Sequence, residues 1–163
     1  MRLNIALQRM DIFHFRPIAT FQRSNVVLLL LFALLSSCND DDGINQVPIV
    51  PFDLTISLDL PLYSSLQSPG GWVYLEGGSR GIVVYRIDAT QFAAFDRHCT
   101  YQVQEACRIN VDPETNITAV DTECCNSEFT LLDGLPQSGP ARRPLRRLQA
   151  MYNVNNNTLR VFN

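Results

Sequence analysis

The sequence predicts an all-β domain, a small antiparallel β-barrel or sandwich with Gly/Pro-rich loops. The first observation is residues 52–60, FDLTISLDL, which alternate apolar and polar side chains without a break. Such alternation is typical of a strand with one buried face. The second is a series of short runs rich in β-branched and aromatic residues, separated by Gly- or Pro-containing turns. The third is that no stretch keeps a helical period with capping residues at both ends.

The expected strands follow one another at short intervals. Pro61 ends the first one, and the turns at residues 68–71 and 76–79 flank the second. Residues 153–157 include three consecutive Asn and predict a hairpin turn into the last strand. After residues 52–60, the expected strands are residues 72–75, 82–85, 92–95, 119–122, 128–131, 145–152 and 159–162.

Residues 1–37 have the pattern of a lipoprotein signal peptide. Residues 26–35, VVLLLLFALL, form an apolar core of ten residues, and four Arg precede it against one acid, Asp11. A basic region followed by an apolar core of this length is typical of a secretory signal. The basic region is long, which leaves Met10 open as the true start in place of Met1. The chain has no apolar run of 18 residues, so no ordinary transmembrane helix is expected.

The sequence Leu35-Ser36-Ser37-Cys38 follows the apolar core and resembles the bacterial lipobox, in which small residues precede a Cys that becomes lipid-modified and N-terminal. Each buried CH₂ of a lipid adds about 0.8 kcal/mol, so several acyl chains hold a soluble domain on a membrane. The expected partner is therefore membrane lipid through Cys38. The expected location is the cell envelope, with the domain anchored to the outer membrane and either periplasmic or surface-exposed. A signal peptide with a free Cys, or a short buried helix, is the alternative.

Residues 38–50 are expected to form an acidic tether ahead of the domain at residues 51–163. Residues 39–50, NDDDGINQVPIV, reach at most about 40 Å when extended. The three Asp resemble a surface-export signal of Bacteroidetes-type lipoproteins, and a charged spacer explains them equally well. From Cys38 onward nine Arg stand against fifteen Asp and Glu, which leaves a net charge of −6. This acidic balance disfavours nucleic-acid binding.

Four cysteines follow Cys38, namely Cys99, Cys107, Cys124 and Cys125. In an exported domain an even set of cysteines indicates two disulfides. A bond between the neighbours Cys124 and Cys125 is strained and is set aside, which leaves two pairings open. A metal site is disfavoured, because seven, sixteen and no residues separate successive cysteines, whereas metal sites usually supply Cys in spaced pairs such as C-x₂-C.

Two loops and a tail resemble Rieske iron–sulfur domains. Residues 94–101, AFDRHCTY, resemble the first cluster loop, C-x-H, and residues 122–129, TECCNSEF, resemble the second, C-P-x-H-G-S-x-F. The tail pattern DG…GPA…PL is matched by residues 132–134, 139–141 and 144–145. The resemblance covers roughly residues 70–163 and is to Rieske-like lipoproteins of Bacteroidetes, whose second loop often carries a Cys-Cys pair. It implies a Rieske-like β-domain.

The cluster ligands that this resemblance implies are mostly missing. A Rieske centre holds one iron by two Cys and the other by two His. Carried over one position at a time, the ligand set falls on Cys99, Tyr101, Thr122 and Cys125, so that one ligand of four survives. The only His after Cys38 is His98, which we interpret as an exposed loop residue. No metal or cofactor is therefore expected, with an atypical 2Fe–2S cluster as the alternative.

The resemblance also implies a disulfide pairing. Respiratory Rieske proteins join their two cluster loops by a bridge that uses the middle Cys of the second loop, which is the position of Cys124. This favours Cys107–Cys124, with Cys99–Cys125 closing the space that a cluster would fill. The crossed pairing, Cys99–Cys124 with Cys107–Cys125, stays open.

The basic run Arg142, Arg143, Arg146 and Arg147 brackets Pro144-Leu145. Such a run can bind an anionic partner such as lipid A or an acidic glycan. We interpret it instead as a solvated strand edge, where charge discourages edge-to-edge pairing.

No enzymatic activity is expected. A Cys nucleophile needs a His converging on it, and thiol–disulfide exchange would need a C-x-x-C motif, which is absent. The sequence thus predicts an envelope lipoprotein with a structural or binding role, whose protein partner stays unidentified. Electron transfer through an atypical 2Fe–2S cluster is the alternative function.

Overall fold

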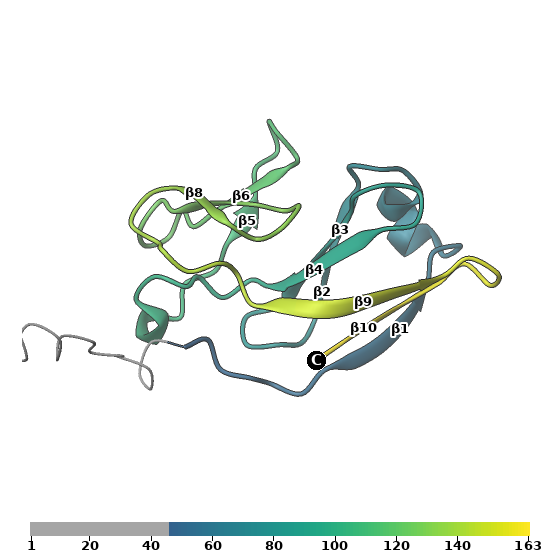
Figure 1. Cartoon of the computed structure of the whole chain (residues 1–163), viewed down its shortest axis with the longest axis horizontal. Coiled ribbons are helices and arrows are strands. Elements are labelled where there is room, and N and C mark those ends of the chain that lie inside the picture. The colour runs from purple at the N-terminus through teal and green to yellow at the C-terminus, as the bar shows by residue number, and fades with distance from the viewer. Residues whose placement is uncertain (1–45) are drawn as a thin grey trace, which may run out of the picture. The chain divides into compact units, whose positions relative to one another are not determined.

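The computed structural model describes residues 46–163 (Figure 1). The predicted signal peptide at residues 1–37, the lipidation site Cys38 and the first part of the predicted tether lie outside the described residues. Within residues 46–163, no helix has the length and apolar character needed to cross a membrane.

The described chain forms two antiparallel sheets. The larger has six strands in the order β1-β10-β9-β4-β3-β2, and the smaller has four in the order β5-β6-β7-β8. Two short 3₁₀ helices are η1 (Pro61–Gln67) and η2 (Val103–Glu105). The predicted all-β fold class is confirmed. The strands are β1 (Asp53–Ser57), β2 (Trp72–Leu75), β3 (Ile82–Arg86), β4 (Phe92–Asp96), β5 (Asn110–Val111), β6 (Thr118–Val120), β7 (Glu128–Thr130), β8 (Pro136–Ser138), β9 (Arg147–Asn153) and β10 (Thr158–Phe162).

The smaller sheet is an insertion between two neighbouring strands of the larger one. Strands β5 to β8 lie in the chain between β4 and β9, and β4 pairs with β9 through Ala94–Leu148 and Phe95–Arg147. Figure 1 shows the chain leaving β4, building the smaller sheet and returning to β9. The insertion carries both loops that resemble Rieske cluster loops, and β4 and β9 hold it in place.

Strands β3 and β4 lie side by side in the larger sheet, where β4 and β9 are the two central strands, and every residue of β4 is buried. Successive side chains of a strand point to opposite faces, so these strands contribute to two cores. Val83 and Phe95 pack in the core shared with Phe129 of the smaller sheet. Val84 and Ala94 belong to the second core, whose buried members include Leu58, Leu66, Leu148, Leu159 and Val161. A strand between two cores must be apolar at almost every position, which explains the unbroken apolar runs of β3 and β4.

The first strand is shorter than predicted and ends at Ser57 rather than residue 60. Its partner β10 begins at Thr158, which pairs with Ser57, so no further residue of β10 is present to extend the ladder. Leu58 is still buried, and its N–H donates to the carbonyl of Asn157 (2.9 Å). Pro61 then begins η1, a helix that the sequence pattern does not predict.

Strands β5 and β8 were not predicted either, because two or three residues are too few to show a period. Pro136 begins β8 at the edge of the smaller sheet, where a residue without an N–H donor is tolerated. The predicted hairpin turn at residues 153–157 is present: Asn153 pairs with Thr158, and Asn157 adopts a left-handed φ of 51°.

Residues 46–50, the end of the predicted tether, contact the domain. Val47 is buried, and its carbonyl accepts a hydrogen bond from the guanidinium of Arg146 (2.6 Å). The carbonyl of Val50 accepts one from the Asn163 side chain (2.7 Å). This part of the predicted tether is therefore fixed to the domain rather than solvated along its length.

Candidate functional site

Two loops of the insertion face each other. The first follows β4 and reaches β5, and the second joins β6 to β7. A disulfide between Cys107 and Cys124 links them, with a Cα–Cα distance of 6.3 Å. The N–H of Cys99 donates to the carbonyl of Cys107 (2.9 Å), which closes the first loop on itself. The loops are thereby held at a fixed separation, and the structure contains the Cys107–Cys124 bridge that the resemblance implies.

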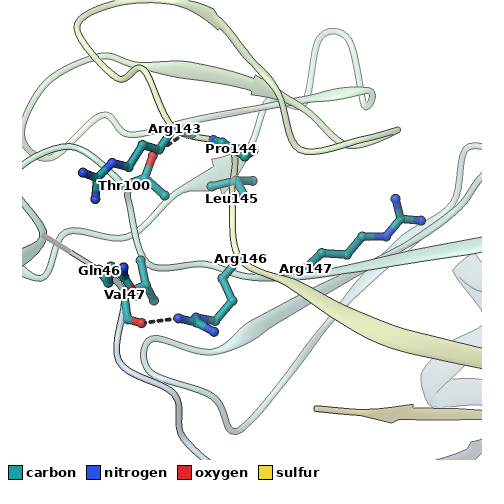
Figure 2. A pocket seen from close by; sticks show the side chains of 8 residues that line it. All are labelled: Gln46, Val47, Thr100, Arg143, Pro144, Leu145, Arg146 and Arg147. Atoms are coloured by element: carbon teal, nitrogen blue, oxygen red, sulfur yellow. Dashed lines mark hydrogen bonds between the residues drawn. The ribbon is translucent and has the colours of Figure 1, made fainter. Parts of the chain in front are cut away.

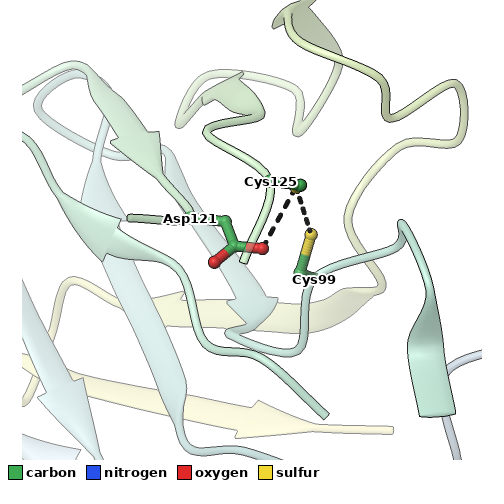
Figure 3. Close-up of side chains that lie close together, drawn as sticks. All are labelled: Cys99, Asp121 and Cys125. Atoms are coloured by element: carbon green, nitrogen blue, oxygen red, sulfur yellow. Dashed lines mark hydrogen bonds between the residues drawn. The ribbon is translucent and has the colours of Figure 1, made fainter. Parts of the chain in front are cut away.

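Three side chains meet between the loops. The Sγ of Cys99 lies 3.8 Å from the Sγ of Cys125, and the latter lies 3.2 Å from Oδ2 of Asp121. Figure 3 shows Cys99 and Asp121 approaching Cys125 from two different segments. Cys99 and Asp121 have no exposed surface, whereas Cys125 is half-buried. We call this group the Cys-Asp-Cys cluster.

The second predicted bridge, Cys99–Cys125, is not formed in this structure, where both residues are thiols. The Cys125 thiol instead lies within hydrogen-bond distance of the Asp121 carboxylate (3.2 Å) and of the Ser127 Oγ (3.0 Å). Ser127 is itself buried and accepts a hydrogen bond from the N–H of Ala141 (3.0 Å). The Cys125 thiol thus has two polar partners besides the sulfur of Cys99.

Asp121 builds the second loop. Its Oδ1 accepts hydrogen bonds from the N–H groups of Glu123 and Cys124 (3.1 Å each), and its carbonyl accepts one from Asn126 (2.8 Å). An Asp at the start of a turn commonly bonds the backbone in this way. Asp121 is a site residue that was not predicted from the sequence. An Asp directly after a strand indicates a turn. Its burial beside two thiols is not visible in the sequence, because it arises only when the insertion folds.

The pKa of the Cys99 thiol is raised above its ordinary value. Burial is the largest cause, and the carboxylate of Asp121 raises this pKa further, while a hydrogen bond from the backbone of Tyr101 acts in the opposite direction. Unless a cation binds beside it, Cys99 is therefore a neutral thiol at physiological pH.

His98 is buried, with 2% of its surface exposed, so the expectation that it is an exposed loop residue is wrong. Its Nδ1 lies 2.8 Å from the Ser79 Oγ, and its Nε2 lies 2.8 Å from the carbonyl oxygen of Val103. Both ring nitrogens are thus engaged by other groups. The neighbouring Asp96 supports this arrangement, because its carboxylate accepts a hydrogen bond from the N–H of His98 (2.9 Å).

The four residues at the Rieske ligand positions do not fit a 2Fe–2S cluster held by two Cys and two His. Cys99 and Cys125 reach the space between the loops. Tyr101 packs against the hydrophobic core, and the side chain of Thr122 is exposed. No imidazole of the described residues is directed to this space, because His98 is held by Ser79 and Val103.

A surface pocket of about 550 Å³ lies where the end of the tether meets the domain (Figure 2). Figure 2 shows the Arg146 side chain reaching the Val47 carbonyl. The Nε of Arg146 is buried and has no hydrogen-bond partner among the described residues. The lining residues include no acid; they are Gln46, Val47, Thr100, Arg143, Pro144, Leu145, Arg146 and Arg147.

The interpretation of the Arg run as a strand edge is wrong. Arg147 begins β9, which lies between β4 and β10 in the larger sheet. Strand β9 has a neighbour on each side, and Arg142, Arg143 and Arg146 lie outside the strands, so the run does not form the edge of a sheet. Its guanidinium lies 5.8 Å from the ring centroid of Phe95.

Several solved structures are similar to this chain. One is from a complex of reduced oxygenase and oxidized ferredoxin in carbazole 1,9a-dioxygenase, with 18% identity, a TM-score of 0.45, and coverage of 71% of this chain and 94% of that one. Another is the ferredoxin of carbazole 1,9a-dioxygenase from Nocardioides aromaticivorans, with 16% identity, a TM-score of 0.45, and coverage of 68% and 95%. A third is described as an NADH-dependent nitrite reductase small subunit from Mycobacterium tuberculosis, with 18% identity, a TM-score of 0.38, and coverage of 69% and 96%.

These likenesses combine identities of 16–18% with TM-scores of 0.45 or less, and they assign neither a family nor a function to this chain. No protein-family model matches the chain, and no curated protein matches it.

Proposed function

We propose that this chain is a cell-envelope lipoprotein, anchored to the outer membrane through lipid on Cys38, whose Rieske-like domain has a structural or binding role and holds no 2Fe–2S cluster. The observation that carries the proposal is the set of side chains between the two loops. Two thiols and a buried carboxylate lie there, in place of the two thiolates and two imidazoles of a Rieske centre.

The pocket beside the tether supports a binding role. Three Arg side chains line it, and guanidinium groups bind phosphate and carboxylate groups well. Val47 lines the same pocket and is nine residues after Cys38, so an extended linker keeps the pocket within about 30 Å of a lipid on Cys38. The phosphate groups of membrane lipids are therefore the anionic partner that we propose for this pocket.

Catalysis is not part of the proposal. A Cys–His pair needs the imidazole within hydrogen-bond reach of the thiol. Both ring nitrogens of His98 are engaged by Ser79 and Val103, and the ionisable group beside Cys125 is the carboxylate of Asp121.

Mass spectrometry of the mature protein, purified from native membranes under non-denaturing conditions, tests this proposal. The expected mass is that of a chain beginning at a diacylglyceryl-modified Cys38, without the mass of two irons and two sulfides. A Cys38→Ala variant should remain an unlipidated precursor, because the thioether acceptor is gone. A lipid-modified Cys38→Ala variant would contradict the anchor, and a mass increment of one 2Fe–2S cluster would contradict the claim of a cluster-free domain.

Electron transfer through an atypical 2Fe–2S cluster is the second candidate function. It is favoured by one observation, the convergence of two free thiols at the position where a Rieske domain holds its cluster. Two irons per chain and a coloured protein would support this candidate in place of the first.

A further inference from the structure

We propose that the Cys-Asp-Cys cluster binds one Zn²⁺ ion, through the sulfurs of Cys99 and Cys125 and one carboxylate oxygen of Asp121. This site is independent of the anchor and of the Arg-lined pocket. It also differs from a Rieske centre in its metal, its nuclearity and its ligands.

Two of the three distances between the ligand atoms are close to those of four-coordinate zinc. Two sulfurs that each lie about 2.3 Å from a tetrahedral Zn²⁺ are separated by about 3.8 Å. The sulfurs of Cys99 and Cys125 are 3.8 Å apart. A sulfur and a carboxylate oxygen on the same ion are separated by about 3.5 Å. The Cys125 sulfur lies 3.2 Å from Oδ2 of Asp121, and all three ligand atoms lie within 4.8 Å of one another.

The burial of Asp121 is a second observation that points to a cation. Its side chain has no exposed surface, and an ionised carboxylate in such a place is costly unless it is paired or coordinates a metal. The one salt bridge found among the described residues joins Arg160 to Asp53, on the far strands of the larger sheet. Oδ1 of Asp121 is held by two backbone N–H groups, which leaves Oδ2 directed to the Cys125 sulfur.

The surroundings fix the proposed ligands before the ion arrives. The Cys107–Cys124 disulfide joins the two loops that carry them, so the approach of Cys99 and Cys125 is set by the fold. Ser127, buried beside Cys125, can donate its hydroxyl proton to the thiolate that forms. Because Cys125 is only half-buried, the fourth position of the ion is left to a water molecule.

Zinc binding competes with oxidation of the cluster. Cys99 and Cys125 are free cysteines, and both would bind zinc as thiolates. The competing reaction is oxidation of the same two thiols to a disulfide, which removes both sulfur ligands. Two electrons and two protons then pass to an oxidant such as a thiol oxidase of the envelope. Metal binding and the Cys99–Cys125 bridge are therefore mutually exclusive.

The test uses the full chain with Cys38→Ser, purified in detergent under inert gas without chelators, so that the four cysteines of the domain are the only ones present. We expect one Zn²⁺ per chain and protection of two thiols from alkylation. Replacement by Co²⁺ should give the thiolate-to-metal charge-transfer absorption and the visible bands of a four-coordinate ion.

Asp121→Asn is the decisive variant, because an amide oxygen can still accept the two backbone hydrogen bonds of the turn. It should weaken Zn²⁺ binding at least as much as the loss of a partner that orients a ligand, about 10- to 100-fold. Cys125→Ser should abolish the charge-transfer absorption. Asp133→Asn is the matched control, since this exposed carboxylate also accepts a backbone hydrogen bond in a turn, and it should bind zinc as the parent does.

Two results would overturn the proposal. One is a chain with Cys99 and Cys125 demonstrably reduced that binds no stoichiometric Zn²⁺ at micromolar concentration. The other is zinc binding that persists unchanged in both Asp121→Asn and Cys125→Ser, which would place the ion elsewhere.

Discussion

The sulfur of Cys99 lies 3.8 Å from the sulfur of Cys125, although 26 positions separate the two residues in the sequence. The insertion of the smaller sheet between β4 and β9 brings their loops together, and the Cys107–Cys124 disulfide fixes them. The two thiols differ in their surroundings, because Cys99 is fully buried and Cys125 is half-buried.

The raised pKa of Cys99 predicts a loss of stability at alkaline pH in the metal-free chain. An unfolded thiol ionises near a pKa of about 8.5, whereas the folded state keeps Cys99 protonated to higher pH. This contribution to stability is fully present below the unfolded pKa and is lost as the pH rises above it. Urea unfolding with a chelator present should show this decline, and Cys99→Ala should reduce its slope. An equal slope in both chains would contradict the prediction.

The Cys107–Cys124 disulfide should contribute about 2–4 kcal/mol to the free energy of unfolding, mostly by restricting the unfolded chain. The bridge closes a loop with a sequence separation of 17. A double variant, Cys107→Ala with Cys124→Ala, should unfold at correspondingly lower urea concentration under non-reducing conditions. Peptide mapping of the parent checks the pairing itself. Recovery of Cys99 linked to Cys124 would favour the crossed pairing instead.

Gly134 should tolerate no side chain. Its φ of +80° is left-handed, and a Cβ there would lie 2.6 Å from a ring carbon of the buried Phe95. Gly70 has a similar φ of +84° but has nothing within 4 Å of the Cβ position, which makes Gly70→Ala the matched control. Both variants carry the backbone strain, and only Gly134→Ala adds overpacking, which costs about 1–3 kcal/mol. Equal destabilisation of the two in urea unfolding would contradict this explanation.

The strands were predictable where the alternation or the run of apolar residues extended over at least four positions. The alternation at residues 52–60 and the apolar runs of β3 and β4 each extend over four or more residues. Strands β5 and β8 could not be predicted, because their pairing is set by neighbours rather than by their own two or three residues.

The site was predictable only in part. The cysteines stand out in the sequence, and the resemblance implied the bridge that the structure contains. The role of Asp121 could not be predicted, because its burial beside two thiols is created by the folded insertion. The burial of His98 escaped prediction for a similar reason, since its partner Ser79 is 19 residues away in the loop between β2 and β3.

The Arg-lined pocket should contribute to the attachment of the domain to anionic membranes. Arg143→Gln with Arg147→Gln in the Cys38→Ser chain should reduce its co-sedimentation with vesicles that contain anionic phospholipid, because two charges are lost at the pocket. Arg80→Gln with Arg108→Gln, at two exposed residues that do not line the pocket, is the control for the loss of two charges alone. The difference between these variants should shrink at high salt. Equal retention of both variants would contradict a role for the pocket.

The absence of a 2Fe–2S cluster is tested most directly by electron paramagnetic resonance of the full chain, purified anaerobically from its native membranes and reduced with dithionite. Thr122 offers a neutral hydroxyl and Tyr101 a phenol at two of the four ligand positions, so neither supplies a donor comparable to a thiolate or an imidazole. We predict a colourless protein without a Rieske-type signal. A signal that integrates to one cluster per chain, and that disappears in Cys99→Ala, would contradict this prediction and establish electron transfer as the function.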